Sequence, residues 1–416
     1  MKRLLWVFAG LCGCSAPAEQ GPAACNDPPE EQTASLLTGW PSVDVCSLGP
    51  DEPTALVLTT TDFATGAVTV VNAQTGAIEP DVAVASTDAI PYGREGRLAV
   101  VNRFGHDFID ELIPGTWRSR GQFALSAPDA GAPNPHAIAF DDDGLAYVTL
   151  FGSAQLQVLD LQRPAAQARV DAIDLSVFAD CDGRPEASTL VRCGDTLWAG
   201  IERLDVPGGF TRVDHDQLVA IDLVTRTPYD LDPDTPGGQG IVLQGAWLKQ
   251  LRRDPADPNG TTVLGLTTGI ERIDLQTGAV TWAVSDEAFA AAGVPHYQLP
   301  LAFALGPQGR YAYVAAYGPA PGSTVDCGAD PGPCFEQARL FEVDLQAESP
   351  QLVPIFEGFQ AVDRVVERTG DVLWVGSNAP GASGLYRFDI SVHPAVLLDG
   401  PHPTGLPPYS MTSFAP

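Results

Sequence analysis

Histidine and carboxylate side chains are the residues of this chain that could meet at one chemical site. With the strands assigned below, five of the six histidines fall on one face of the molecule: His106, His136, His215, His296 and His402. Acidic residues are expected on the same face: Asp62, Glu202, Asp205, Asp214 and Asp216. Carboxylate oxygens can ligate a divalent metal such as calcium, and imidazole nitrogens can ligate a divalent transition metal. Two hypotheses follow: a ligand-binding site containing the five histidines, or a metal site formed by Glu202, Asp205, Asp214, Asp216 and His215. Polar residues collect in loops in any case, and no spacing singles out a ligand pair.

Three Asp-Gly sequences resemble parts of calcium-binding loops: "DDDG" (141–144), "DCDG" (180–183) and "DPADPNG" (254–260). In such loops alternate oxygens surround the ion and a distal bidentate acid completes the coordination. None of the three sequences supplies the full loop with that acid, so the favoured interpretation is an ordinary Asp-Gly turn. The chain also contains no G-x-S-x-G, Walker, Rossmann or H-E-x-x-H motif, and no catalytic residue is predicted.

Short β-strands must position these side chains. The stretch "LAYVTLFGSAQLQVLDLQ" (145–162) consists of two alternating apolar runs around a small polar turn. The run "HAIAFDDDG" precedes it and "ARVDAIDL" follows it, which indicates four successive strands.

The same order recurs seven times along the chain, with an Asp or Asn anchoring each third strand: Asn72, Asp110, Asp160, Asp222, Asp274, Asp344 and Asp389. Successive anchors are 38 to 70 residues apart, which accommodates a propeller blade of about 40–45 residues plus inserted loops. The predicted fold is an all-β, seven-bladed β-propeller of four-stranded antiparallel blades over residues 54–416. Trp198 and Trp374, in second strands, are expected to pack between blades.

Closure of the ring is predicted from what the end copies lack. The first copy begins with "ALVLTTT" (55–61), already a second strand, whereas "YSMTSFA" (409–415) follows a complete seventh blade. We therefore expect the C-terminal strand to become the innermost strand of blade one, with Met411 and Phe414 filling the interior.

The stretch "HAIAFDDDGLAYVTLFGSAQLQVLDLQ" resembles the YVTN-repeat β-propellers, whose second strand reads "YVTL" here and "YVAA" at 313–316. The resemblance covers most of residues 54–416 and is clearest in the third and sixth copies. It implies a seven-bladed fold and an extracytoplasmic location, and it carries no catalytic motif.

The N-terminus has the order of an export signal: Lys2 and Arg3, an apolar run, then small residues. "LCGC" (11–14) resembles a bacterial lipobox, which predicts a signal peptide over 1–13, acylation of Cys14 and a lipidated, Pro-rich tether over 14–53. Ser15 after the anchor favours an outer-membrane lipoprotein. Ordinary cleavage near "APA" (16–18) is the alternative and would give a soluble periplasmic or secreted protein.

Six cysteines remain once Cys12 is removed and Cys14 is acylated: Cys25, Cys46, Cys181, Cys193, Cys327 and Cys334. An even number in an exported protein predicts disulfides. Pairing of sequence neighbours predicts Cys25–Cys46, Cys181–Cys193 and Cys327–Cys334.

The formal net charge of −29 excludes nucleic acid as a partner and leaves the lipid anchor as the only expected contact with a membrane. The favoured function is that of a non-enzymatic binding or scaffold protein in the cell envelope, without a cofactor. Its partner would be an envelope protein, a glycan or a small molecule. The alternative is a metal-dependent lactonase or lyase that uses the histidine and carboxylate set.

Overall fold

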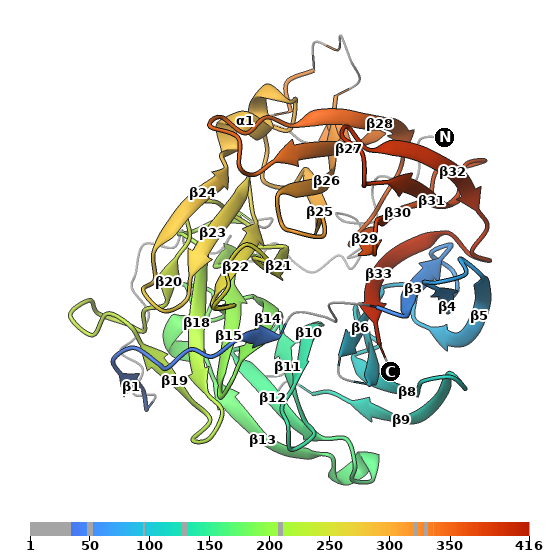
Figure 1. Cartoon of the computed structure of the whole chain (residues 1–416). Coiled ribbons are helices and arrows are strands. Elements are labelled where there is room, and N and C mark those ends of the chain that lie inside the picture. The colour runs from blue at the N-terminus through green and yellow to red at the C-terminus, as the bar shows by residue number, and fades with distance from the viewer. Residues whose placement is uncertain are drawn as a thin grey trace, which may run out of the picture.

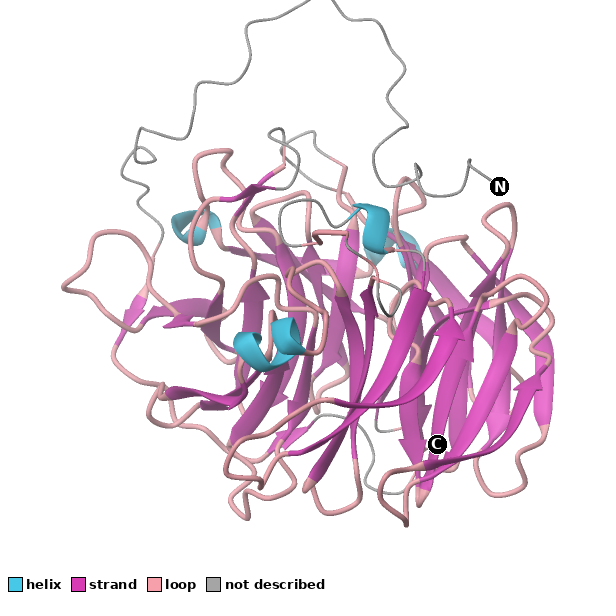
Figure 2. Ribbon diagram, turned by 90° about the horizontal axis from the view of Figure 1, so that it is seen from above, coloured by secondary structure: helices cyan, strands magenta, loops and turns pink. Residues whose placement is uncertain are grey.

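The fold is a closed ring of seven antiparallel β-sheets, each with at least four strands (Figure 1). The computed structural model describes residues 35–47, 53–94, 96–126, 132–206, 211–319, 323, 325–327, 332–335 and 337–415. The predicted seven-bladed β-propeller is confirmed. In Figure 2, turned by 90°, the strands run between two faces on which the loops gather.

The strands are numbered along the chain, and each blade is given from the innermost strand outward. Blade one contains β33 (Pro408–Phe414), β3 (Ala55–Thr61), β4 (Gly66–Asn72) and β5 (Ile78–Ala85). Blade two contains β6 (Ala89–Arg94), β7 (Arg97–Asn102), β8 (Phe108–Ile113) and β9 (Arg118–Ala124). Blade three contains β10 (Pro135–Phe140), β11 (Leu145–Leu150), β12 (Gln155–Asp160) and β13 (Arg169–Asp174).

The fourth blade is the largest, with β14 (Ala187–Cys193), β15 (Thr196–Ile201), β18 (Gln217–Asp222) and β19 (Thr227–Asp230). Three short strands extend it: β1 (Leu37–Thr38), β2 (Cys46–Ser47) and β20 (Ile241–Val242). A separate hairpin, β16 (Leu204–Asp205) and β17 (Thr211–Arg212), lies between β15 and β18 in the chain.

The remaining blades have four strands each. Blade five contains β21 (Gln250–Arg253), β22 (Thr262–Leu266), β23 (Ile270–Asp274) and β24 (Val280–Val284). Blade six contains β25 (Pro300–Leu305), β26 (Tyr311–Gly318), β27 (Gln337–Asp344) and β28 (Val353–Phe359). Blade seven contains β29 (Val366–Thr369), β30 (Val372–Ser377), β31 (Gly384–Asp389) and β32 (Val396–His402). The helices are short: η1 (Ala165–Gln167), η2 (Ser176–Phe178), α1 (Asp286–Ala291) and η3 (Gly332–Cys334).

The C-terminal strand closes the ring as predicted. β33 pairs antiparallel with β3, with Met411 opposite Leu58 and Phe414 opposite Ala55. Met411 and Phe414 are 3% and 1% exposed, so both fill the interior. One blade is therefore built from both ends of the described chain.

The anchor residues explain why the repeat is visible in the sequence. Asn72 and five of the six aspartates are the last residues of the third strands. Each accepts a hydrogen bond from a backbone N–H two or three residues further on, which stabilises the turn to the fourth strand. Asp110 differs because it lies inside β8, where it accepts hydrogen bonds from the side chains of Ser119 and Gln122.

Large apolar side chains from the strands form the core, and Trp198 and Trp374 are buried in it as expected. Trp198 packs with residues of blades four and five, including Leu218 and Val263. The indole of Trp374 donates a hydrogen bond of 2.9 Å to Thr369. The buried apolar side chains form five clusters, and each cluster contains residues of neighbouring blades.

Part of the predicted tether lies against the propeller. β1 pairs in parallel with β19, and β2 pairs antiparallel with β14. The indole of Trp40 donates a hydrogen bond of 2.9 Å to the carbonyl oxygen of Leu275 in blade five. Residues 35–47 therefore contact blades four and five. Residues 1–34, with the predicted signal peptide and Cys14, lie outside the described part of the chain.

Two of the predicted disulfide pairings are wrong. Cys46 is bonded to Cys193, not to Cys25, and so Cys193 is not bonded to Cys181. The physical reason is that β2 lies beside β14 with these two cysteines directly opposite each other, although 147 residues separate them in sequence. Cys181 is disulfide-bonded, and Cys25 lies outside the described residues.

The third pairing, Cys327–Cys334, is confirmed. Disulfides are typical of proteins that fold in an oxidising, extracytoplasmic compartment. Within the described ranges, no helix is long and apolar enough to cross a membrane.

Candidate functional site

The five predicted histidines are spread over the molecule and do not meet at one point. His106 is exposed in the loop between β7 and β8, and His215 is exposed just before β18. His296 stacks on Tyr297, and His402 is the last residue of the outermost strand β32, where its Nε2 lies 2.8 Å from Asp399. His136 is the histidine on an innermost strand, β10.

The acidic residues proposed as metal ligands are also not gathered as one ligand set. Glu202 and Asp216 are buried, whereas Asp214 is half-exposed and forms an ion pair of 2.8 Å with Arg203. Asp205 belongs to the β16–β17 hairpin, and Asp62 is exposed in a turn where it accepts backbone hydrogen bonds. In the part of the chain that the structure describes, the one group of three such side chains close enough to share an ion lies elsewhere, as shown below.

A different set of polar residues surrounds the central axis. We call it the axial cluster: Asp88, Tyr92, Arg103, His136, Lys249, Asp363, Arg364 and Tyr409. Most of these residues lie at or just before the start of an innermost strand, so they share one face of the ring. The cluster is formed by side chains from blades one, two, three, five and seven.

Arg103 is the centre of one half of this cluster. It forms ion pairs with Asp88 and Asp363 and donates a hydrogen bond of 2.9 Å to the hydroxyl of Tyr409. Tyr409 in turn hydrogen-bonds to Asp88. The Arg103 side chain is only 9% exposed, and its partners come from blades one, two and seven. A buried guanidinium with two carboxylates holds these three inner strands in fixed positions.

Arg364 connects the other half. Its Nη1 donates to the hydroxyl of Tyr92 at 2.7 Å, and that hydroxyl donates to the backbone oxygen of His136 at 2.6 Å. Its Nη2 donates to the backbone oxygen of Lys249 at 3.3 Å. Arg364 thus connects blade seven to blade two on one side and to blade five on the other.

The side chain of Lys249 is half-buried and belongs to the residue directly before the innermost strand β21. Its Nζ donates to the backbone oxygens of Gln298 at 2.9 Å and Pro300 at 2.5 Å. Burial lowers the pKa of Lys249 to about 8, although Glu202 and Asp363 oppose the shift. The amine can therefore exchange a proton near neutral pH.

His136 supplies a neutral imidazole to the same site. Burial and the positive charges of Arg103 and Arg364 hold its pKa well below the usual value. Its ring stacks on Phe151 with centroids 4.4 Å apart, and its buried Nε2 has no hydrogen-bond partner among the described residues. The imidazole is positioned to accept a proton or a hydrogen bond from a bound molecule.

The charge at the axis is unusual for so acidic a protein. Burial raises the pKa of Glu202 well above its usual value and that of Asp216 to about 8, so both favour the neutral acid. Three cations, Arg103, Lys249 and Arg364, are then opposed by the carboxylates of Asp88 and Asp363. The local balance favours an anion.

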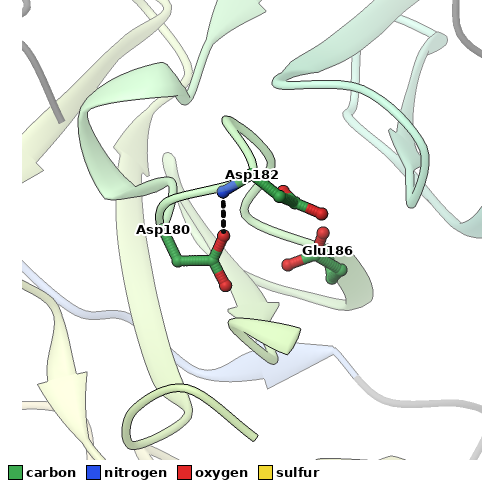
Figure 3. A group of neighbouring side chains, drawn as sticks. All are labelled: Asp180, Asp182 and Glu186. Atoms are coloured by element: carbon green, nitrogen blue, oxygen red, sulfur yellow. Dashed lines mark hydrogen bonds between the residues drawn. The ribbon is translucent and has the colours of Figure 1, made fainter. Parts of the chain in front are cut away.

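A second polar group lies in the loop between η2 and β14. Asp180, Asp182 and Glu186, which we call the acidic cluster, each place an oxygen within 4.8 Å of the others (Figure 3). Asp180 and Asp182 belong to the "DCDG" sequence that was interpreted as an ordinary turn. Glu186 supplies the distal acid that this sequence was thought to lack.

Sequence reasoning named His136 and considered the "DCDG" sequence, but it missed the other residues of the axial cluster and Glu186. The residues of the axial cluster come from five blades and have no spacing in common. The acidic cluster had a usable signal, because D-x-D-G-x-x-E spans only residues 180–186. Glu186 lies directly before β14 and has a positive φ of 46°.

Comparison with known proteins supports the fold. No protein-family model and no curated sequence matches this chain. A structure from Bacteroides fragilis, provisionally described as a 6-phosphogluconolactonase, aligns with a TM-score of 0.55 at 12% identity over 87% of this chain and 98% of that one. The periplasmic gluconolactonase PpgL of Pseudomonas aeruginosa aligns with a TM-score of 0.55 at 14% identity, over 87% and 99%. At these identities the likeness concerns the β-propeller alone, and membership of the YVTN-repeat family stays a prediction.

Proposed function

We propose that this protein is an extracytoplasmic binding protein that takes a small, hydroxylated anion at the axial cluster. The observation that carries the proposal is the convergence of Arg103, Lys249 and Arg364 at the axis of a protein with a net charge of −29. Guanidinium and ammonium groups bind carboxylate and phosphate oxygens through charge-assisted hydrogen bonds. The Nε2 of His136, which has no partner among the described residues, adds an acceptor suited to a ligand hydroxyl group.

Isothermal titration calorimetry with gluconate, inorganic phosphate and glucose tests the proposal. We expect gluconate or phosphate to bind and glucose, which has no charge, to bind at least about tenfold more weakly. Lys249→Met should weaken anion binding at least tenfold, about 1.4 kcal/mol. Arg310→Met is the matched control, because Arg310 is 53% exposed and pairs with Asp344 away from the axis. Equal binding by the two variants, or no binding of either anion, would contradict the proposal.

A lactonase is the second candidate, and the neutral imidazole of His136 is the observation that favours it. In such a reaction His136 takes a proton from a water molecule as its oxygen attacks the lactone carbonyl, and the ring C–O bond then breaks as the imidazolium returns that proton to the leaving ring oxygen, which gives a hydroxy acid. Arg364 or Lys249 would stabilise the negative charge on the carbonyl oxygen. The gluconolactonases named above have the same fold, which fits this candidate. Hydrolysis of δ-gluconolactone above the spontaneous rate, lost in His136→Gln, would favour the enzyme over the binding protein.

We propose further that the protein is a lipoprotein held in the cell envelope by acylated Cys14. The support is the order of charged, apolar and small residues before Cys14 in the sequence, together with the disulfides of the folded domain. The lipid would keep the axial cluster close to the membrane while small solutes diffuse to it.

A further inference from the structure

The acidic cluster has the spacing that one shared cation requires. Calcium binds oxygen ligands at about 2.3–2.6 Å, so two oxygens on the same ion can be no more than about 5 Å apart. Asp180, Asp182 and Glu186 each offer an oxygen, and these oxygens lie within 4.8 Å of one another. Figure 3 shows the carboxyl groups of Asp182 and Glu186 facing each other, with Asp180 on the same loop.

The free oxygens of this cluster are a second and independent observation. One oxygen of each carboxyl is taken by a backbone N–H: Asp180 by that of Asp182 at 3.0 Å, Asp182 by that of Arg184 at 2.9 Å, and Glu186 by that of Leu204 at 3.1 Å. The other oxygens, Asp180 Oδ2, Asp182 Oδ2 and Glu186 Oε1, are buried without a partner in the described structure. Glu186 is 0% exposed and Asp180 2%, so water does not solvate these two side chains. Burying a carboxylate oxygen without a hydrogen-bond partner destabilises the folded state, and such atoms are rare in proteins.

Nearby arginines do not satisfy these oxygens. Arg203 uses its Nη1 to bind Asp214 at 2.8 Å, and Arg184 contributes its backbone N–H to Asp182. Without a cation, burial and mutual repulsion raise the pKa of Glu186 to about 10 and that of Asp180 to about 7. The charges of Arg203 and Arg184 lower the pKa values of Asp180 and Asp182, but among the described residues neither arginine forms an ion pair with the three carboxyl groups.

We propose that Asp180, Asp182 and Glu186 bind a calcium ion. Three carboxylates without histidine or a free thiol form a hard oxygen site, which calcium prefers over zinc. Calcium also takes more ligands than zinc, which suits a site where water would fill the remaining coordination positions. Asp182 is only half-buried, which leaves a path by which the ion can enter. Because Glu186 directly precedes the innermost strand β14 and bonds to Leu204 at the start of β16, the ion fastens these two segments together. This inference is independent of the function proposed for the axial cluster.

Thermal unfolding and calorimetry of the chelator-treated full chain with CaCl₂ alone test the site. We expect binding with a Kd on the order of 10⁻⁴ M, as in extracellular calcium modules, and a melting temperature that rises by several degrees in millimolar calcium. Glu186→Gln and Asp180→Asn should weaken calcium binding at least tenfold and abolish the rise. Without calcium both variants should melt near the temperature of the wild type, because each amide keeps the size of the side chain and an oxygen that can accept the same backbone hydrogen bond.

Asp143→Asn is the matched control, since Asp143 is an exposed acid in the similar "DDDG" turn. It should keep the full calcium response. No heat and no shift for the wild type would overturn the proposal. So would an equal calcium response in the wild type, Glu186→Gln and Asp180→Asn, because calcium would then bind elsewhere on the acidic surface. The proposal would also be overturned if both variants melted at lower temperatures but bound calcium with unchanged affinity. The two carboxyl groups would then contribute to folding and not to calcium binding.

Discussion

Arg364 donates a hydrogen bond of 2.7 Å to the hydroxyl of Tyr92, and this contact joins blade seven to blade two. The same hydroxyl donates to the backbone oxygen of His136 at 2.6 Å in blade three. Blades two, three and seven are therefore linked through one oxygen atom.

Tyr92→Phe should consequently destabilise the protein. The substitution keeps the aromatic ring of residue 92 but removes its hydroxyl, so the Arg364 guanidinium and the His136 carbonyl each lose one buried hydrogen-bond partner. We expect a loss of about 1–3 kcal/mol in the free energy of unfolding, measured by urea titration. Tyr311→Phe, in a half-buried position where the ring stacks on His393, should change it by less than about 0.5 kcal/mol. Equal stabilities of the two variants would show that the Tyr92 hydroxyl is energetically unimportant.

Closure by β33 predicts that a C-terminal side chain stabilises the whole ring. Phe414 is 1% exposed, so Phe414→Ala should cost about 3–5 kcal/mol. Val396 in the outermost strand β32 is 55% exposed, and Val396→Ala should have a small effect. Differential scanning calorimetry should show a single lowered transition for Phe414→Ala. Separate melting of blade one, with the other blades unchanged, would contradict this expectation.

The two described disulfides should differ in their contribution to stability. The Cys46–Cys193 bridge closes a loop with a sequence separation of 147, and Cys327–Cys334 one with a separation of 7. The chain-entropy model gives about 5 kcal/mol for the first and about 2 kcal/mol for the second. Paired serine substitutions, compared by urea unfolding under oxidising conditions, check this order. A larger loss from the Cys327 and Cys334 pair would be incompatible with it.

Lys249 should make stability depend on pH in the alkaline range. Its pKa is about 8 in the folded protein against 10.5 for an ordinary lysine, so between these values the unfolded chain binds a proton that the folded chain has released. The free energy of unfolding should therefore rise with pH across this window, by up to about 3 kcal/mol from this group. Lys249→Met should lose that rise. Parallel stability curves for the wild type and the variant from pH 8 to 10.5 would be the contrary result.

Acylation of Cys14 predicts where the protein is found after fractionation of the producing cell. Cys14→Ser should release it from the membrane fraction into the soluble extracytoplasmic fraction. Cys12→Ser, two residues earlier in the predicted signal, should leave it in the membrane fraction. A wild-type protein with an unmodified N-terminus, measured by mass spectrometry, would exclude the lipid anchor.

The fold could be predicted because its signals are local. Alternation within "LAYVTL" determines which side chains face the core, and the anchor aspartates stabilise the turns that follow the third strands. Closure of the ring could be predicted in the same way, because the strand over residues 409–415 had no partner and the first blade lacked its innermost strand. Only neighbouring residues and a count of strands were needed.

The axial cluster and the Cys46–Cys193 bridge could not be predicted in that way. Arg103 and Asp363 are 260 residues apart and meet only because the ring closes. Cys46 reaches Cys193 because residues 35–47 cross blades four and five, which no local pattern indicates. The acidic cluster lies between these cases, since its residues are close in sequence but Glu186 belongs to the next blade.

Because blade one combines early and late parts of the chain, its sheet cannot be completed until the C-terminal strand has been synthesised. Three of its strands are synthesised early, at residues 55–85, but the fourth is supplied by residues 408–414. A chain emerging from a ribosome or an export channel therefore carries an incomplete sheet with an open edge until residues 408–414 have emerged. An exposed sheet edge can pair with other chains, so chaperone binding at β3 during that interval would protect the chain until β33 closes the ring.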